Sequence, residues 1–490
     1  MPAVLKDVLI VATVSGVTTL NTFMTGALTI ALPTIGKDLH FLEANLQWPV
    51  TVFSLSYGCT LLLFGRIGDI IGGRVMFLAG SAWFSAWSIA LAFAPTSVAF
   101  IIFVALMGLG AAANTPAGIG IFVGHFPPGA RRSNAFGVLG AGQPIGYILG
   151  LVLSGVISQS RVSWRGIFYV QAGLGLLLAL LGLFILEKES PSSAKRYDKG
   201  LDLGGALLST AGIGILTYSL AASESAPHGW ATPRIVALTC AALALLVIFW
   251  FYEKWREQKA VAVLMPPSIW SRAGARMPAT IGMVFFAWWN FNALLYITTL
   301  YYQQVSGLSP LQTSIRFLPS IISGICTNWR AAALIFALID IHASYWKMSF
   351  WVMALLAGAD LIYPVGTLQV ASAFDDDSQS LAGGIFTVAT RLGTSIGLAV
   401  TSSIATAVSQ KYHSRHPVLP GDSPTVLMVG FRAAGFSLCA AAVTSFVIAL
   451  IGLRGTGIVG RKRKTEIEKV ETPGAVGVEE GKVGEDEIRP

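Results

Sequence analysis

The stretch Gly65-Arg66-Ile67-Gly68-Asp69-Ile70-Ile71-Gly72-Gly73-Arg74 lies between two long apolar segments. Neither the segment before it, 48–64, nor the segment after it, 75–94, contains a charged residue. A helix needs about 20 such residues to cross the hydrocarbon layer of a bilayer, so both segments have transmembrane length. The glycines and charges between them therefore predict a tight turn at the membrane surface that joins two transmembrane helices.

The composition of the whole chain also indicates a membrane protein. Of the 490 residues, 54% are hydrophobic and only 12% are charged, whereas soluble domains carry about 25% charged residues. The apolar runs are about 20 residues long and lack the alternation of a membrane β-barrel. These observations predict an all-α integral membrane protein that lies in the lipid bilayer, and they argue against a soluble enzyme.

Thirteen apolar stretches are candidates for transmembrane helices. They cover residues 8–32, 47–64, 75–94, 98–123, 135–158, 166–186, 203–222, 233–251, 279–302, 311–327, 347–370, 381–407 and 427–453. Lys and Arg gather after the second, fourth, sixth and eighth stretches, which by the positive-inside rule predicts a cytosolic amino terminus. The charged tail 454–490 has no apolar periodicity, and we expect it to be disordered and cytosolic.

The region 311–341 is too short for the two helices that its apolar pieces suggest. Two spans and a turn need roughly 38 residues, and only 31 are present. We expect that a segment of about 30 residues is missing here, which would leave one helix pair truncated. An error in the gene model, a degenerate gene and a short half-helix hairpin are three explanations.

The turn 65–74 resembles the signature loop of the major facilitator superfamily, which connects the second and third spans. That loop reads Gly, any, Leu, any, Asp, Arg, any, Gly, Arg, Arg or Lys, and the positions that match here are Gly65, Asp69, Gly72 and Arg74. The resemblance implies a gating loop in which Asp69 caps a neighbouring helix end when the cavity faces outward. A tight-turn and topology signal is the alternative interpretation.

Six spans, a basic linker, two extra spans and then six more, with 311–341 counted as a truncated pair, would make fourteen. This grouping resembles the fourteen-span drug:proton antiporter branch of this superfamily, in its fungal form. The resemblance covers roughly residues 10–453 and includes the stretches 31–39 and 202–206. It implies the major facilitator fold, with two six-helix bundles plus two extra central helices and alternating access. The implied domains are an amino-terminal bundle (1–186), a linker with the two extra helices (187–277), an incomplete carboxy-terminal bundle (278–453) and the tail (454–490).

The fifth span carries small residues at every fourth position, which places them on one helix face. The residues that form this antiporter-like motif are Gly142, Pro144, Gly146 and Gly150. Pro144 favours a kink, and glycines allow a close approach of another helix. By resemblance to exporters this face is a hinge and seal between the bundles, and ordinary close packing is the alternative.

Two ionisable residues lie deep inside predicted spans, where a charge costs at least about 2.5 kcal/mol. Asp360 and Arg391 are candidates for proton coupling, with a link between them that breaks when Asp360 is protonated; a permanent ion pair is the alternative. Family members also use an acidic residue in the first span and an Arg in the fourth span. Here no acidic residue occurs in 8–35, and Val104 takes the place of the Arg.

Aromatic and amide side chains in the middle of spans suggest a cavity for a mostly apolar, neutral organic compound. The candidates for this cavity are Asn21, Gln143, Trp289, Asn290 and Asn292. Amides also join helices inside membranes, so each candidate has this alternative role. Trp289, Asn290 and Asn292 cannot all face one way, and at least one of them packs against helices or lipid.

The sequence shows no nucleotide-binding motif, metal-ligand spacing or catalytic set, so we expect no cofactor, no metal and no enzymatic activity. The net charge of +8 reflects basic loops and does not suggest nucleic acid. We expect a monomer in the plasma membrane that exports a small organic compound, such as a secondary metabolite, toxin or drug, with proton coupling. Uptake of a small solute such as ammonium, and a non-transporting sensor or degenerate transporter, are the alternatives.

Overall fold

The computed structural model describes residues 3–41, 48–127, 129–158, 160–187, 201–226, 229–259, 261–268, 270, 276–308, 310–316, 365–370, 379–418, 420–421 and 423–452. In these ranges all regular secondary structure is helical. Eleven of the described helices are long and apolar enough to cross a membrane. The prediction of an all-α membrane protein is therefore confirmed.

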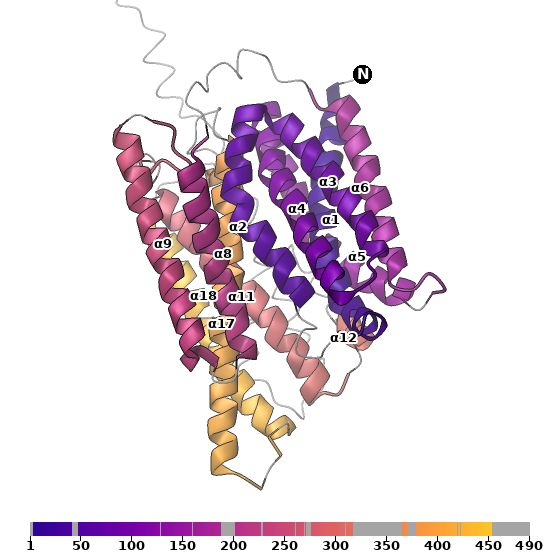
Figure 1. The fold of residues 1–490 in the computed structure, drawn as a ribbon, viewed down its shortest axis with the longest axis vertical. Coiled ribbons are helices and arrows are strands. Elements are labelled where there is room, and N and C mark those ends of the chain that lie inside the picture. Colours follow the sequence, from indigo (N-terminus) through magenta and orange to yellow (C-terminus); the bar gives the residue numbers. More distant parts are fainter. Residues whose placement is uncertain are drawn as a thin grey trace, which may run out of the picture.

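The first six helices form one bundle, on one side of the molecule in Figure 1. They are α1 (Ala3–Asp38), α2 (Trp48–Ile71), α3 (Gly73–Ala92), α4 (Ser97–His125), α5 (Ala130–Ser158) and α6 (Arg165–Ile185). Helix α1 packs on α5, α4 packs on α2 and α3, and α6 packs on α3. Buried aromatic rings fill the space between these helices, and Phe100 makes edge contacts with Trp164 and Phe168.

Two further helices, α8 (Leu203–Ser225) and α9 (Pro233–Gln258), follow the first bundle as a hairpin with a short turn, η2 (Gly229–Ala231). Helix α8 packs against α9, α2 and α17 (Gln379–Arg415). The rings of Trp48 and Tyr218 lie 5.7 Å apart, so the start of α2 meets the end of α8. The two helices are therefore antiparallel, and the beginning of α8 lies at the same end of the molecule as turn 65–74.

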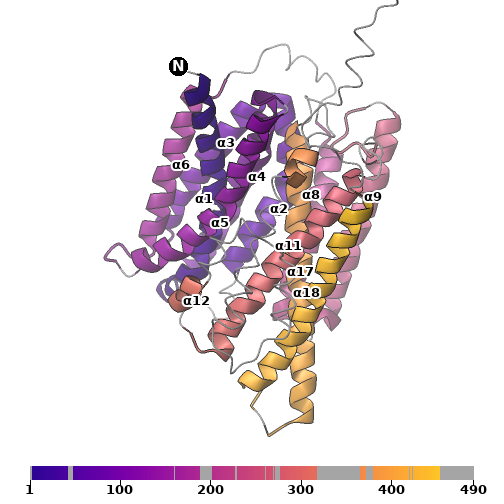
Figure 2. The same cartoon turned by 180° about the vertical axis from the view of Figure 1, so that it is seen from behind.

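The remaining helices form the second group, which Figure 2 shows from behind. They are α11 (Arg276–Leu300), the π-helical turn η3 (Tyr301–Val305), the short α12 (Pro310–Arg316), the helical segment 365–370, α17 and α18 (Pro424–Gly452). Helix α11 packs on α17 and α18, which also pack on each other. Most of the expected spans 311–327 and 347–370, the truncated helix pair, Asp360 and the tail lie outside the described residues.

The glycine face of α5 lies against α1. A Cβ atom on Gly146 would collide with the backbone oxygen of Thr19, and one on Gly150 would collide with that of Phe23. Ser154 continues the same face and donates a hydrogen bond to the carbonyl oxygen of Ala27 at 2.9 Å. This face therefore closes a contact inside the first bundle, and its role as a hinge between bundles stays a prediction.

Candidate functional site

The turn between α2 and α3 is built on a glycine that other residues cannot replace without strain. Gly72 has φ 102° and ψ 135°, and it is the N-cap residue of α3. Only glycine adopts such angles at low cost, because it lacks a Cβ atom. Gly65 is buried one and a half turns before the end of α2. The two helices therefore follow each other with a single residue between them, so the connection is shorter than the predicted turn 65–74.

The charged residues of this turn cap the ends of other helices. Asp69 accepts a hydrogen bond from the backbone N–H of Leu381 at 3.1 Å, in the first turn of α17. Arg74 donates a hydrogen bond from Nη2 to the carbonyl oxygen of Leu183 at 2.7 Å, near the end of α6. A negative charge at a helix amino terminus and a positive charge at a carboxy terminus are both favourable. Asp69 thus connects the first bundle with the second.

The first turns of α17 make further close contacts with the first bundle. A Cβ atom on Gly383 would lie 2.9 Å from Cβ of Ile119, and one on Gly384 would lie 3.2 Å from the carbonyl oxygen of Leu61. The two glycines let α17 approach α4 and α2 closely. At this end of the molecule, the described helices of the two bundles are therefore in contact.

A buried polar cluster lies where α1, α2 and α4 meet. Asn21 donates hydrogen bonds from Nδ2 to Asn114 Oδ1 at 2.9 Å and to Thr115 Oγ1 at 3.1 Å. The hydroxyl groups of Tyr57 and Thr115 are 2.8 Å apart. We call these four residues, together with Arg391, the central polar cluster. Asn21 is the only one of its amides that the sequence analysis selects.

Two amide atoms of the central polar cluster have no hydrogen-bond partner among the described residues. They are Asn21 Oδ1, an acceptor, and Asn114 Nδ2, a donor. The two side chains are 3% and 1% exposed, so bulk water does not satisfy these atoms. An unsatisfied buried polar group costs about 1–3 kcal/mol. The first bundle therefore holds hydrogen-bonding capacity that a bound molecule could use.

Arg391 on α17 brings the second bundle to this cluster. Its guanidinium carbon lies 4.2 Å from the centre of the Tyr57 ring. Nε of Arg391 is buried and has no hydrogen-bond acceptor among the described residues. A guanidinium group over an aromatic face gains about 0.5–2 kcal/mol, depending on how far it is desolvated. The contact joins the two bundles in the middle of their spans.

The candidates on α11 do not meet this cluster in the described contacts. Asn290 donates a hydrogen bond to the carbonyl oxygen of Leu438 on α18 at 2.6 Å. Asn292 and Trp289 instead face α17, where they donate to Thr394 and Thr401 at 3.0 and 3.3 Å. All three side chains therefore join helices within the second group. Gln143 on α5 is half-buried.

Sequence reasoning missed Tyr57, Asn114 and Thr115. The signal for Asn114 was present, because it is an amide in the middle of the apolar fourth span, directly before Thr115 and Pro116. Asn21 alone cannot be distinguished from an amide that joins helices. A second amide at a similar depth in another span is the feature that indicates a polar cluster.

Ionic contacts at the start of α1 fix it to its neighbours in the first bundle. His125 Nε2 lies 3.0 Å from a carboxylate oxygen of Asp7, and Arg131 approaches the same carboxylate at 3.7 Å. Lys6 binds Glu187, just after α6. This hydrogen bond holds the pKa of the Glu187 carboxyl below its usual value. These contacts stay inside one bundle and do not form part of the central polar cluster.

The chain belongs to a known family of membrane transporters. The family model described as Major Facilitator Superfamily matches residues 14–335. The "MFS-type transporter 1" of Pyricularia oryzae is 31% identical over 526 aligned positions, which cover 93% of this chain and 85% of that protein. The chain is therefore a member of the Major Facilitator Superfamily, and the resemblance of turn 65–74 to the signature loop is explained.

Other relatives are named for different transported substrates. The tetracenomycin C resistance and export protein of Streptomyces glaucescens is 28% identical, over 76% of this chain and 71% of that protein. The low affinity ammonium transporter of Saccharomyces cerevisiae is 26% identical, over 76% of this chain and 77% of that protein. Among solved structures, the human organic anion transporter MFSD10 has a TM-score of 0.57 at 14% identity, with 91% of this chain and 100% of that chain covered. This last likeness concerns the fold alone.

Proposed function

We propose that this transporter exports a small organic compound by alternating access and that the compound binds at the central polar cluster. The observation that carries the proposal is the pair of unsatisfied amide atoms on Asn21 and Asn114. They belong to the cluster that Arg391 of the second bundle reaches through Tyr57. A molecule held between two bundles can be released when they separate. The relatives that export antibiotics support the outward direction.

The gate of this cycle is turn 65–74. In the present arrangement Asp69 holds the first turn of α17 against α2. We propose that this is the outward-facing state, in which the cytosolic end is closed, and that inward opening breaks the Asp69 contact. Gly65 and Gly72 keep the turn short, and Arg74 ties it to α6, so that the first bundle moves as one body.

The driving force in this proposal is the proton gradient. Asp360, on the span before α17, is the proposed proton-binding residue, and Arg391 is the cation that responds to its charge. Asp360 lies outside the described residues, so the proposal rests on its place in an apolar span and on the observed position of Arg391.

The remaining features that we propose are a fourteen-span, fungal-type architecture with the domains given above, a monomer, and a plasma membrane location with a cytosolic amino terminus.

The cluster favours an organic compound over ammonium. Its described members supply one guanidinium, two amides, a hydroxyl and a phenol, but no carboxylate. A guanidinium repels a second cation at short range. A compound with an apolar body and a hydroxyl group can instead use both unsatisfied amide atoms, because the hydroxyl can donate to Asn21 Oδ1 and accept from Asn114 Nδ2.

Disruption of the gene in its own host tests the direction of transport. We expect a compound to accumulate inside the mutant cells and to disappear from the medium, measured by mass spectrometry of both fractions. A mutant that instead fails to grow on ammonium as the nitrogen source would replace export by uptake. A mutant with neither change would indicate a protein that does not transport.

Arg391→Gln is expected to reduce export of that compound by about tenfold to a hundredfold. The reason is the loss of a charge-assisted hydrogen bond to the compound, worth about 1.5–3 kcal/mol. The thermal unfolding midpoint should fall only slightly, because the lost contact with Tyr57 is worth about 0.5–2 kcal/mol and Arg391 makes no ion pair among the described residues. Lys411→Gln, an exposed change on the same helix, is the control and should keep normal transport. An Arg391→Gln protein that transports normally would remove this residue from the site.

A further inference from the structure

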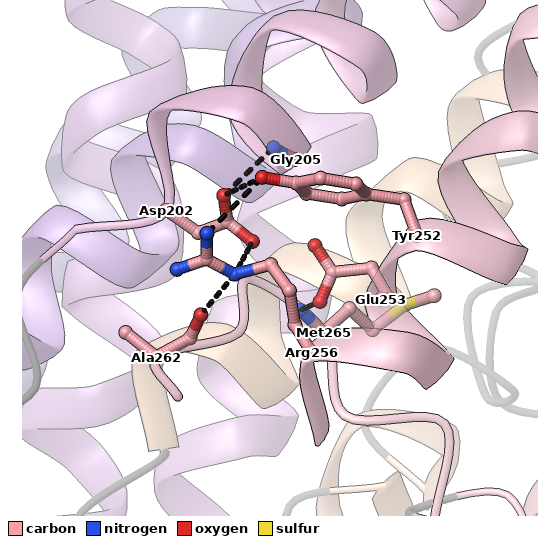
Figure 3. A network of polar contacts seen from close by, with 7 residues as sticks. All are labelled: Asp202, Gly205, Tyr252, Glu253, Arg256, Ala262 and Met265. Atoms are coloured by element: carbon pink, nitrogen blue, oxygen red, sulfur yellow. Dashed lines mark hydrogen bonds and ion pairs between the residues drawn. The ribbon is translucent and has the colours of Figure 1, made fainter. Parts of the chain in front are cut away.

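The α8–α9 hairpin carries a group of buried polar side chains that the proposed transport cycle does not use (Figure 3). Asp202 is the N-cap residue of α8, and its Oδ1 accepts a hydrogen bond from Gly205 N at 2.9 Å. Tyr252, Glu253 and Arg256 face this cap from the last turns of α9. Asp202 and Glu253 are 1% and 0% exposed. Two carboxyl groups therefore lie in a space that water does not reach.

Arg256 neutralises one of these carboxyl groups. Its Nε lies 3.2 Å from Asp202 Oδ2 and donates a hydrogen bond to the carbonyl oxygen of Ala262 at 2.8 Å. Its Nη1 donates to the hydroxyl group of Tyr252 at 3.1 Å, and that hydroxyl in turn lies 3.4 Å from Asp202 Oδ1. Asp202 and Arg256 thus form a pair with no net charge.

Glu253 is the second carboxyl group. Its Oε2 accepts a hydrogen bond from the backbone N–H of Met265 at 3.1 Å. Its Oε1 and Asp202 Oδ2 both lie close to Gly205. A Cβ atom built on Gly205 would lie 2.8 Å from Asp202 Oδ2 and closer still to Glu253 Oε1. Among the described residues, Glu253 Oε1 has no hydrogen-bond donor opposite it, and Asp202 Oδ2 has only the ion-paired Nε of Arg256 at 3.2 Å. The two side chains can form a hydrogen bond with each other only if one of them carries a proton.

Among the described residues, the charges around Glu253 leave one carboxylate uncompensated unless a proton is bound. Segment 261–268 contributes backbone groups but contains no charged residue. The other helices that pack on α8 are α2 and α17, and the charged residues of α2 at this end are Arg66 and Asp69, the latter bonded to Leu381. An unpaired buried charge costs several kcal/mol. A single proton between the two carboxyl groups removes this cost.

We propose that Asp202 and Glu253 form a binding site for one proton, separate from the central polar cluster, and that this proton keeps segment 261–268 docked on the α8–α9 hairpin. In the chain, this segment lies between α9 and α11. When segment 261–268 leaves, both carboxyl groups become solvated and are ionised at neutral pH. The docked state then holds one proton more than the undocked state, and docking weakens as the pH rises.

Hydrogen exchange of the full-length protein in lipid nanodiscs tests this site without any transport measurement. The amide of Met265 should be protected in the docked state, because it is bonded to Glu253. Between about pH 5 and about pH 8, the protection of segment 261–268 should fall by up to about tenfold per pH unit, after correction for the intrinsic exchange rate. A wild-type protein whose protection does not change with pH overturns the proposal.

Variants distinguish an effect of the bound proton from an effect on the folded structure. In Glu253→Gln the amide keeps the contact with Met265 and donates to Asp202, so protection should stay high and lose its pH dependence. Glu257→Gln is the matched control: Glu257 lies one turn further and accepts a hydrogen bond from Ser268 N at 3.1 Å, so this variant should keep the wild-type slope. Asp202→Asn retains a good N-cap residue and should also lose the slope. A wild-type slope in both Glu253→Gln and Asp202→Asn contradicts the proposal.

Discussion

Replacing Gly146 by leucine is expected to prevent the protein from accumulating in a folded form. Even the Cβ atom of an alanine would collide with the backbone oxygen of Thr19 and with Thr22 on α1. Overpacking of this kind costs about 1–3 kcal/mol, and more where backbone atoms must move. Gly146→Ala should therefore lower the thermal unfolding midpoint, although alanine favours a helix over glycine by about 1 kcal/mol. The measurement is the yield and midpoint of the purified protein.

Gly137 provides the control on the same helix. It is exposed, and a Cβ atom there would meet nothing within 4 Å. Gly137→Ala and Gly137→Leu should keep the yield of the parent protein, and the alanine variant should be slightly more stable. Equal behaviour of the Gly137 and Gly146 variants would mean that α1 and α5 are not in close contact.

The second large effect is expected for Asp69→Ala, which should reduce transport by about twofold to thirtyfold. The change removes the acceptor for Leu381 N–H and a negative charge at the start of α17. Loss of a capping side chain costs about 0.5–2 kcal/mol, and 1.4 kcal/mol corresponds to a factor of ten in the equilibrium between open and closed states. Folding should be preserved, because the lost contact lies between the bundles.

Distance measurements between spin labels report this shift directly. Labels can be placed at Ile71 on α2 in the first bundle and at Val365 in the second group, and both side chains are about half exposed. In Asp69→Ala the distance distribution should move to longer values, as the ends of the bundles separate. Asp38→Ala is the control, because Asp38 accepts a hydrogen bond from Trp164 at 2.9 Å and so stays within the first bundle. An unchanged distribution in Asp69→Ala would show that this contact does not hold the gate.

The sequence was sufficient to predict the two helices on either side of turn 65–74. The predicted spans 47–64 and 75–94 correspond to α2 and α3, and the structure extends α2 to Ile71. The extension was missed because its polar residues lower the local hydropathy, although they remain helical. The same holds for α17, where the predicted 381–407 continues to Arg415. Hydropathy detects the part of a helix that lies in lipid, and it does not detect polar turns beyond the membrane.

The site was only partly predictable. Asn21 and Arg391 were selected because a polar side chain inside an apolar span is costly unless it has a partner or a function. Both belong to the central polar cluster. Asn290 was selected on the same ground, yet its amide is bonded to α18. The two cases look alike in the sequence. They differ in the rotation of each helix about its axis, which the packing of neighbouring helices sets.

The sequence by itself determined that the chain crosses a membrane as helices, where it turns, and which residues make the turn. These features are local, because each backbone group in lipid must find its partner within its own helix. Only the tertiary structure decided that Asp69 reaches Leu381, that Arg391 covers Tyr57, and that Glu253 meets Asp202. Such contacts join residues far apart in the chain, and they depend on which helices pack together and at what depth.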